Sequence, residues 1–153
     1  LLKLILKVVE NYRGVDVDLL LVGGFLHDIG KIYEFSFDRA IEYTDEGQLL
    51  GHLVMEVQLV DNKIAAIENF PPELAMLVKH LLVSHHGAYE FGSPKLPQTL
   101  EAVILHSLDD LDGKIQAIKN LPEKEPGSKW TVFHRAYGRS FYRPNSGPGN
   151  NGG

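Results

Sequence analysis

The sequence contains no cysteine, which excludes a disulfide framework, a thiolate nucleophile and a cysteine-based structural zinc site. It also lacks an apolar run of the roughly 20 residues that a bilayer-spanning helix needs. No cleavage site of a signal peptide follows the apolar first residues. With 153 residues, 44% of them apolar and 23% charged, the composition is that of one globular domain with a real core. We therefore expect a cytoplasmic protein without a membrane partner.

Acidic residues are missing from the last part of the chain. The net charge of −5 argues against a generic binder of polyanions. From Pro126 to Gly153, however, there is no acidic residue. A basic strip thus follows an acidic body. The basic residues of this strip are Lys129, Arg135, Arg139 and Arg143.

Apolar residues at helical spacing predict a mostly helical protein. Asp16 is the expected N-cap of the second helix, and Gly30 lies beyond its expected end. Apolar and polar residues alternate between positions 32 and 46, which predicts a short hairpin or an extended loop there. The expected helices cover residues 2–12, 17–29, 48–69, 72–86, 98–120 and 129–142.

The last of these expected helices carries both arginines and aromatic residues. The arginines are spaced by four residues, and the aromatic residues by three or four, so that a helix would align each set. Aromatic rings beside arginines suit single-stranded nucleic acid, through base stacking and phosphate contacts. The alternative is that the aromatic residues dock the helix on the core while the arginines stay solvated. The aromatic residues are Trp130, Phe133, Tyr137 and Phe141.

Four of the seven histidines end or interrupt apolar runs, one of them followed directly by an aspartate. Polar groups are costly to bury at such places unless they share a partner. Imidazoles together with carboxylates favour a divalent metal ion as that partner. For His80 and His134 we expect ordinary hydrogen bonding instead. The role of His106 is ambiguous, since it could pair with Asp109 or Asp110 one helical turn further on. These four histidines and the acidic neighbour of the first are His27, Asp28, His52, His85 and His86, with His27-Asp28 as a doublet.

Four segments, in chain order, carry a resemblance to a known family: HDIGK, GQLLGH, SHHGAYEFGSP and LEAVILHSLDDLDGKI. HDIGK resembles the signature of the HD-domain metal-dependent phosphohydrolases, an all-helical superfamily. The four together are similar to the HD domain of the YhaM-type 3′–5′ exoribonucleases, over most of residues 1–117. The resemblance implies an all-α fold, an HD-domain helical bundle, and metal-dependent hydrolysis of phosphodiester bonds in RNA.

The resemblance also implies a set of metal ligands. Asp28 would bridge two ions, and Asp109 would be the distal aspartate, with its neighbour Asp110 as the alternative. Mn²⁺ is the expected metal, and Mg²⁺, Co²⁺, Fe²⁺ or Ni²⁺ are alternatives. The implied ligands are His27, Asp28, His52, His85, His86 and Asp109.

Other residues are expected to act on the substrate or to orient the ligands. Asp28 and Lys31 are the expected catalytic residues, since the ammonium of Lys31 would meet a phosphate oxygen. The alternative for Lys31 is that it satisfies the end of a helix. Glu56 or Asp112 would fix the second ring nitrogen of the ligand histidines. The expected substrate-binding residues are Lys31, Glu90, Ser93, Arg135 and Arg139, with ordinary loop capping as the alternative for Glu90 and Ser93.

The expected domain is an HD domain over residues 1–143, followed by a disordered tail over 144–153. The family's first His has no counterpart before His27. The resemblance places this His just upstream of Leu1, so that it is either cut off from this chain or lost by divergence. We also expect an OB-type nucleic-acid-binding domain upstream. The expected partners are single-stranded RNA or a nucleotide, and a further copy of the chain in a homo-oligomer.

Two alternative functions remain at this point. One is a phosphohydrolase of the same superfamily that acts on nucleotides or cyclic dinucleotides. The other is a non-catalytic RNA-binding or regulatory module.

Overall fold

The computed structural model describes residues 1–37 and 39–144. The chain divides into two compact units, Leu1–Asp110 and Leu111–Gly153. Helix α7 (Leu100–Lys119) begins in the first unit and ends in the second. Residues 145–153, which hold nearly all of the predicted disordered tail, lie outside the described residues.

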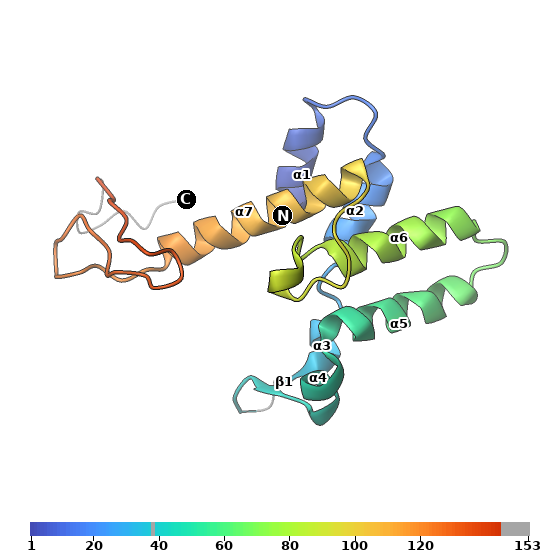
Figure 1. The fold of residues 1–153 in the computed structure, drawn as a ribbon, viewed down its shortest axis with the longest axis horizontal. Coiled ribbons are helices and arrows are strands. Elements are labelled where there is room, and N and C mark those ends of the chain that lie inside the picture. The colour runs from blue at the N-terminus through green and yellow to red at the C-terminus, as the bar shows by residue number, and fades with distance from the viewer. Residues whose placement is uncertain (38, 145–153) are drawn as a thin grey trace. The chain divides into compact units, whose positions relative to one another are not determined.

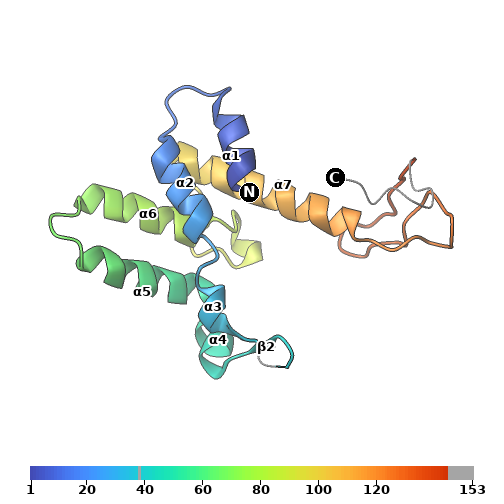
Figure 2. The same cartoon turned by 180° about the vertical axis from the view of Figure 1, so that it is seen from behind.

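The first unit is a bundle of helices (Figure 1). Helices α5 and α6 run side by side, and α2 packs against α1 and α6 (Figure 2). This arrangement confirms the predicted all-α fold. Before α7, the helices are α1 (Leu2–Val9), α2 (Val17–Leu26), α3 (Lys31–Glu34), α4 (Asp45–Leu50), α5 (His52–Ala65), α6 (Pro72–Ser84) and the 3₁₀ helix η1 (Tyr89–Phe91).

The core of this unit lies where α1, α2, α6 and α7 meet. Its central side chains, none of them exposed to solvent, are Ile5, Leu20, Leu81, Leu82 and Leu105. Fully burying an aliphatic side chain of this size stabilises the fold by about 1.5–3 kcal/mol. The ends of α2 and α6 and one face of α7 are thus held by the core, and the polar residues described below project from these ends.

The His27-Asp28 doublet lies in a turn rather than in a helix. The Asp16 side chain caps α2 as predicted, since its Oδ1 accepts a hydrogen bond of 3.0 Å from the Leu19 N–H. The helix ends at Leu26, three residues earlier than predicted, with His27 as its C-cap. The chain then turns directly into α3. The doublet is therefore the junction between two helices.

The predicted helix over residues 48–69 is wrong in one respect, because the chain breaks at Gly51. Gly51 has φ 73°, a left-handed conformation that favours glycine. It ends α4, and His52 starts α5 in a new direction. The N–H of His52 then donates to the carboxylate of Glu34 over 3.0 Å, which satisfies one of the unpaired donors at the start of α5.

The short hairpin expected between residues 32 and 46 is present. Strand β1 (Phe35–Ser36) pairs antiparallel with β2 (Glu42–Tyr43), and Phe35 lies opposite Tyr43. Their rings are in contact, with centroids 4.7 Å apart. The hairpin fills the sequence between α3 and α4.

Gly87 ends the turn that follows α6 and packs against the ring of His106. Its φ is 80°, and a Cβ at this position would lie 2.0 Å from His106 Cε1. The Nδ1–H of His106 donates to the carbonyl of His85 over 2.9 Å, which fixes the ring against the turn. A side chain at position 87 would therefore displace both the ring and the turn that carries His85 and His86.

We expect Gly87→Ala to lower the free energy of unfolding by about 2–4 kcal/mol, from backbone strain and steric overlap. Gly113→Ala is the matched control, because no heavy atom lies within 4 Å of the added Cβ and the position is helical. That control is expected to stabilise the protein by about 0.5–1 kcal/mol. Urea unfolding followed by circular dichroism checks both values. Equal effects of the two substitutions would contradict the packing of Gly87 on His106.

The second unit contains no regular helix after α7 within the described residues. The predicted helix over 129–142 is wrong. Gly138, with φ 62°, lies inside it and reverses the chain, and the aromatic and β-branched residues around it favour extended backbone. Arg135 and Arg139 are therefore not aligned by a helix. Isolated antiparallel pairs join Glu123 to Thr131, Trp130 to Tyr142 and His134 to Arg139.

Candidate metal centre

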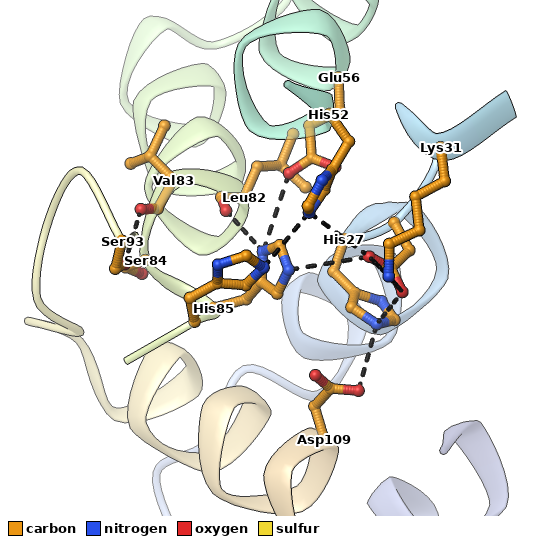
Figure 3. A network of polar contacts seen from close by, with 12 residues as sticks. His27, Lys31, His52, Glu56, Leu82, Val83, Ser84, His85, Ser93 and Asp109 are labelled. Carbon is orange, nitrogen blue, oxygen red and sulfur yellow. Dashed lines mark hydrogen bonds and ion pairs between the residues drawn. The ribbon is translucent and has the colours of Figure 1, made fainter. Parts of the chain in front are cut away.

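Asp28 of the first unit lies between His27 on one side and His52 and His85 on the other. Figure 3 shows these three histidines and Asp109 pointing toward one another. The Oδ2 of Asp28 is 3.4 Å from His27 Nε2. Its Oδ1 is 3.8 Å from His52 Nε2 and 3.9 Å from His85 Nε2. The His27 Nε2 is in turn 3.3 Å from Asp109 Oδ1. One carboxylate thus faces a His27–Asp109 group with one oxygen and a histidine group with the other.

The four histidines around Asp28 share one pattern of hydrogen bonds. In each ring, Nδ1 lies within hydrogen-bonding distance of an oxygen that only accepts, so Nδ1 is the nitrogen that carries the proton. His27 Nε2 lies against the carboxylates of Asp28 and Asp109 and donates to Asp109 when it is protonated, whereas the Nε2 atoms of His52, His85 and His86 keep a lone pair in the neutral ring. This is the arrangement in which a histidine binds a metal ion through one nitrogen and is oriented through the other. The pairs are His27 with Gly24 O (3.1 Å), His52 with Glu34 (3.1 Å), His85 with Leu82 O (2.7 Å) and His86 with Phe91 O (3.0 Å).

Three of these histidines form a group that fits one cation. Ring nitrogens of His52, His85 and His86 all lie within 4.8 Å of one another. The Nε2 atoms of His52 and His86 are 3.2 Å apart, and two lone pairs at that separation repel each other. A divalent ion at roughly 2.0–2.3 Å from each nitrogen would replace the repulsion by two bonds. The donor set therefore fits a borderline divalent metal.

Lys31 forms an ion pair with Asp28. Its Nζ lies 2.8 Å from both carboxylate oxygens and hydrogen-bonds to Oδ2. The buried Oδ1 accepts no hydrogen bond from the described residues. Burial raises the pKa of Asp28, but the hydrogen bond from Lys31 and the charges of His27 and Lys31 outweigh it and hold the pKa below its usual range. Asp28 is thus an anion with one oxygen still available.

Asp109 reaches the centre from α7. Its hydrogen bond with His27 lowers the pKa of the Asp109 carboxyl against the opposing effect of burial. Burial alone would lower the pKa of His27, but the contact with Asp109 and the negative charges of both aspartates raise it. Of the two aspartates that the sequence left open, Asp109 therefore has the geometry of a member of this group.

Glu34 holds His52 by two contacts and was missed by the sequence analysis. Its side chain is 8% exposed, and its carboxylate lies 3.1 Å from His52 Nδ1 in addition to accepting from the His52 N–H. The sequence analysis looked for this role in Glu56 or Asp112. The only signal in the sequence was an acidic residue six positions after Asp28, which is common, and the contact depends on the unpredicted break at Gly51.

Glu56 is buried against the same histidines without a hydrogen-bond partner. Its side chain is 0% exposed, and its Oε1 lies 3.8 Å from His85 Nδ1. Neither oxygen has a partner among the described residues. Burial, and then the negative charge of Asp28, raises the pKa of Glu56 to about 9. Burial also lowers the pKa of His85 to about 4, so this ring is neutral near pH 7.

The loop after α6 positions His86 and carries two of the expected substrate-binding residues. Glu90 is exposed on η1. Ser93 is 3% exposed, and its hydroxyl lies within hydrogen-bonding distance of Val83 O (3.1 Å) and Lys95 O (2.7 Å). Ser93 therefore anchors the loop to α6, which is the capping alternative given for it above.

The remaining predicted residues lie outside this centre. Arg135 and Arg139 are exposed and belong to the second unit, where the Arg139 guanidinium lies 5.4 Å from the centre of the Phe141 ring. His80 accepts a hydrogen bond of 2.9 Å from the Gln98 N–H, the ordinary role expected for it. His106 contacts the carbonyl of His85 and so supports the turn.

This helical bundle and its centre of imidazole and carboxylate donors define a metal-binding helical domain. The family model described as HD domain matches residues 2–114. The chain therefore belongs to the HD-domain family, whose members depend on divalent metal ions.

Several curated proteins are similar to nearly the whole of this chain. The chain is 40% identical over 146 residues to the 3′–5′ exoribonuclease YhaM of Bacillus velezensis and 39% identical over 146 residues to that of Bacillus subtilis. It is 40% identical over 148 residues to the 3′–5′ exoribonuclease YhaM of Listeria monocytogenes. Each match covers 94% of this chain and 46% of the relative, so the chain spans a little under half the length of these relatives.

Two further comparisons are negative. No solved structure matches the chain. None of the helices in the described part of the chain is long and apolar enough to cross a membrane.

The contact between Glu34 and His52 leads to a prediction about metal affinity. We expect Glu34→Gln to weaken Mn²⁺ binding by about 10–100-fold, because the amide places an N–H₂ donor against a donor of His52 and removes the charge that makes the ring a better ligand. Isothermal titration with Mn²⁺ measures the affinity. Glu68→Gln removes the same charge from an exposed position and should leave the affinity unchanged. Equal affinities in Glu34→Gln and the unaltered protein would show that Glu34 is only structural.

Proposed function

We propose that this chain is the catalytic HD domain of a Mn²⁺-dependent 3′–5′ exoribonuclease that removes nucleotides from single-stranded RNA. The observation that carries the proposal is the position of Asp28, with one oxygen toward His27, which also contacts Asp109, and the other toward His52 and His85. A carboxylate in this position suits two cations that it bridges. The names of the relatives supply the RNA substrate and the direction.

The residues would divide between two ions. Asp28 would contribute to both sites, His27 and Asp109 to the first, and the group of His52, His85 and His86 to the second. Ions held there supply Lewis acidity and an activated water for attack on phosphorus. In the reaction, a water oxygen bonds to phosphorus and the P–O3′ bond breaks. The product is a nucleoside 5′-monophosphate, and the 3′ oxygen of the shortened strand takes up a proton.

Positively charged residues would bind the phosphates. Lys31 is 44% exposed at the open side of the centre, and it can exchange its contact with Asp28 for a non-bridging phosphate oxygen once cations occupy the site. Arg135 and Arg139 are exposed and remain proposed contacts to the RNA backbone, each by itself rather than as a helical row. Glu90 also remains a proposed substrate contact, whereas the buried hydroxyl of Ser93 supports the loop instead.

The direct test uses single-stranded RNA labelled at its 5′ end and incubated with the protein and Mn²⁺. A ladder of products shortened from the 3′ end, with release of 5′-monophosphates, is the expected result. A 3′-labelled strand should lose its label in the first step. Label released from the 5′ end, or internal cuts, would contradict an exonuclease of this direction.

The same assay separates the alternative functions. Hydrolysis of nucleotides or cyclic dinucleotides with RNA left intact would assign the site to a phosphohydrolase of small substrates. RNA binding without hydrolysis in Mn²⁺, Mg²⁺, Co²⁺, Fe²⁺ or Ni²⁺ would favour a non-catalytic module. A cytoplasmic location and assembly into homo-oligomers remain predictions, and sedimentation of the purified protein checks the second.

A further inference from the structure

The second unit holds an exposed tryptophan beside a polar cavity. The cavity has a volume of about 370 Å³, within the range of small-molecule sites. Only residues of the second unit line it, and they combine one large aromatic ring with charged and hydroxyl side chains. They are Lys124, Glu125, Ser128, Trp130 and Ser140.

Trp130 is held in place although half of its surface is exposed. Its carbonyl accepts a hydrogen bond of 2.8 Å from the Lys124 N–H, and its own N–H donates to Ser128 Oγ over 3.1 Å. Its ring packs edge-on against Tyr142 across an antiparallel pair, with centroids 5.1 Å apart. Trp130 is 50% exposed and Tyr142 51% exposed. Such a ring is oriented before any ligand arrives, so little conformational entropy is lost on binding.

The exposure of these rings contradicts the alternative given in the sequence analysis, in which the aromatic residues only dock a helix on the core. That interpretation required them to be buried on a core, yet Phe133 is also 62% exposed. The buried member of the segment is instead Thr131, at 0% exposed, whose hydroxyl accepts from the Phe141 N–H over 3.0 Å. The small polar residue thus anchors the segment, while the rings of Trp130, Phe133 and Tyr142 are exposed.

We propose that this cavity binds one nucleotide of a single-stranded RNA, with the base stacked on Trp130. This inference rests on the proposed function for its choice of ligand. Stacking on an aromatic face requires an unpaired base, which a duplex does not offer. Lys124 supplies a positive charge for the adjoining phosphate, while Glu125 and the hydroxyls of Ser128 and Ser140 face the polar edges of the base and ribose.

The charge of the surrounding segment favours RNA over a protein partner. Between Pro126 and Pro144 there are no acidic residues. Lys129, Arg135 and Arg139 are exposed and alternate in the sequence with the aromatic residues of this segment. Cations interleaved with stacking surfaces are the features with which proteins bind single strands without sequence preference.

Trp130 is the only tryptophan of the chain, so its fluorescence reports on this cavity alone. The protein is titrated with hexaadenylate in EDTA, which prevents hydrolysis, and the expected result is saturable quenching. A hairpin with a stem of six base pairs, and AMP alone, should each need at least a tenfold higher concentration for half-maximal quenching. Equal quenching by the duplex, or by AMP, would overturn the assignment to a strand.

Variants are compared by the anisotropy of fluorescein-labelled hexaadenylate. We expect Trp130→Ala to weaken binding about tenfold or more, and Trp130→Phe to restore most of it. Phe25→Ala removes an exposed ring from the first unit, and should bind like the unaltered protein. Lys124→Ala should reduce the salt dependence of binding by about one phosphate contact, whereas Lys3→Ala, with the same change of charge, should not. Binding unchanged in Trp130→Ala would overturn the inference.

Hydrolysis of RNA in Mn²⁺ is measured in parallel, so that the two proposals fail separately. If the protein hydrolyses RNA and the Trp130→Ala variant binds hexaadenylate as tightly as the unaltered protein, the nucleotide site is refuted and the proposed function stands. Saturable quenching at Trp130 without hydrolysis would leave the nucleotide site and remove the proposed function.

Discussion

Replacing Asp28 by asparagine is expected to lower kcat/KM for single-stranded RNA by about three orders of magnitude or more, while the helical fold is retained. The substitution keeps the size of the side chain and removes one negative charge. It also turns one of the two oxygens into a donor. Each of the two groups of donors faces a different oxygen of Asp28. Whichever oxygen the amide nitrogen replaces, one group therefore loses its shared carboxylate ligand.

The fold should survive because Asp28 lies in a turn and 37% of its side chain is exposed. Its main partner is Lys31, whose side chain is itself 44% exposed, so that its ammonium can turn to water. Circular dichroism and thermal unfolding check that the variant is folded, and single-turnover assays with labelled RNA measure the rate.

Asp61→Asn is the matched control for this experiment. Asp61 pairs with Lys79 over 2.7 Å on the surface of the first unit, so that substitution removes the same charge and one ion pair. Surface ion pairs contribute about 0–1 kcal/mol, and activity should be unchanged. Substantial hydrolysis by folded Asp28→Asn would show that the doublet is structural and that the proposed centre is not the active site.

Local sequence signals were sufficient for most of the first unit. The N-cap at Asp16, the apolar spacing of α6 and α7 and the hairpin near residues 32–46 each depend on neighbours in the sequence, and such features can be predicted from it. Gly51 was visible in the sequence, but glycine inside a helical pattern is ordinarily tolerated at a cost of about 1 kcal/mol. The hydrogen bond from the His52 N–H to Glu34, 18 residues earlier along the chain, stabilises the break at Gly51.

The second unit shows where helical spacing misleads. Aromatic residues three or four positions apart also occur in irregular segments, and the cross-strand contact of Trp130 with Tyr142 cannot be seen from spacing along one helix. Gly138 was the available warning. The turn at Gly138 separates the two halves of the predicted helix, so that Arg139 pairs back with His134 instead of following Arg135 along an axis.

For the candidate centre, the sequence supplied the donors and the fold supplied their partners. The six predicted metal ligands were selected by residue type, by position in the sequence and by the resemblance to the family. Their Nδ1 partners at Gly24, Leu82 and Phe91 are backbone carbonyls, which every residue has and no sequence pattern marks. Glu34 is a side chain, but its role follows from the direction in which α5 leaves Gly51.

Binding of Mn²⁺ is expected to stabilise the protein strongly, independently of any catalysis. At a concentration 100 times the dissociation constant, one ion that binds only the folded state adds about 2.7 kcal/mol to the free energy of unfolding. For a chain of this length, that raises Tm by roughly 5–10 °C. The physical reason is that folding brings the carboxylates of Asp28 and Asp109 to the same nitrogen of His27, at 3.4 and 3.3 Å, and leaves the facing Nε2 atoms of His52 and His86 3.2 Å apart, where their lone pairs repel each other. A cation relieves that repulsion.

The measurement is a thermal scan in EDTA, in Mn²⁺ and in Mg²⁺. Mg²⁺ should give a smaller shift, because it prefers oxygen ligands and octahedral geometry over a group rich in imidazole. The double variant His52→Ala with His86→Ala should lose most of the Mn²⁺ shift, whatever its own Tm in EDTA. His80→Ala is the control, since His80 only caps the Gln98 N–H, and it should keep the full shift. An equal Mn²⁺ shift in both variants would mean that the ion binds elsewhere, and no shift in the unaltered protein would mean that these donors hold no metal.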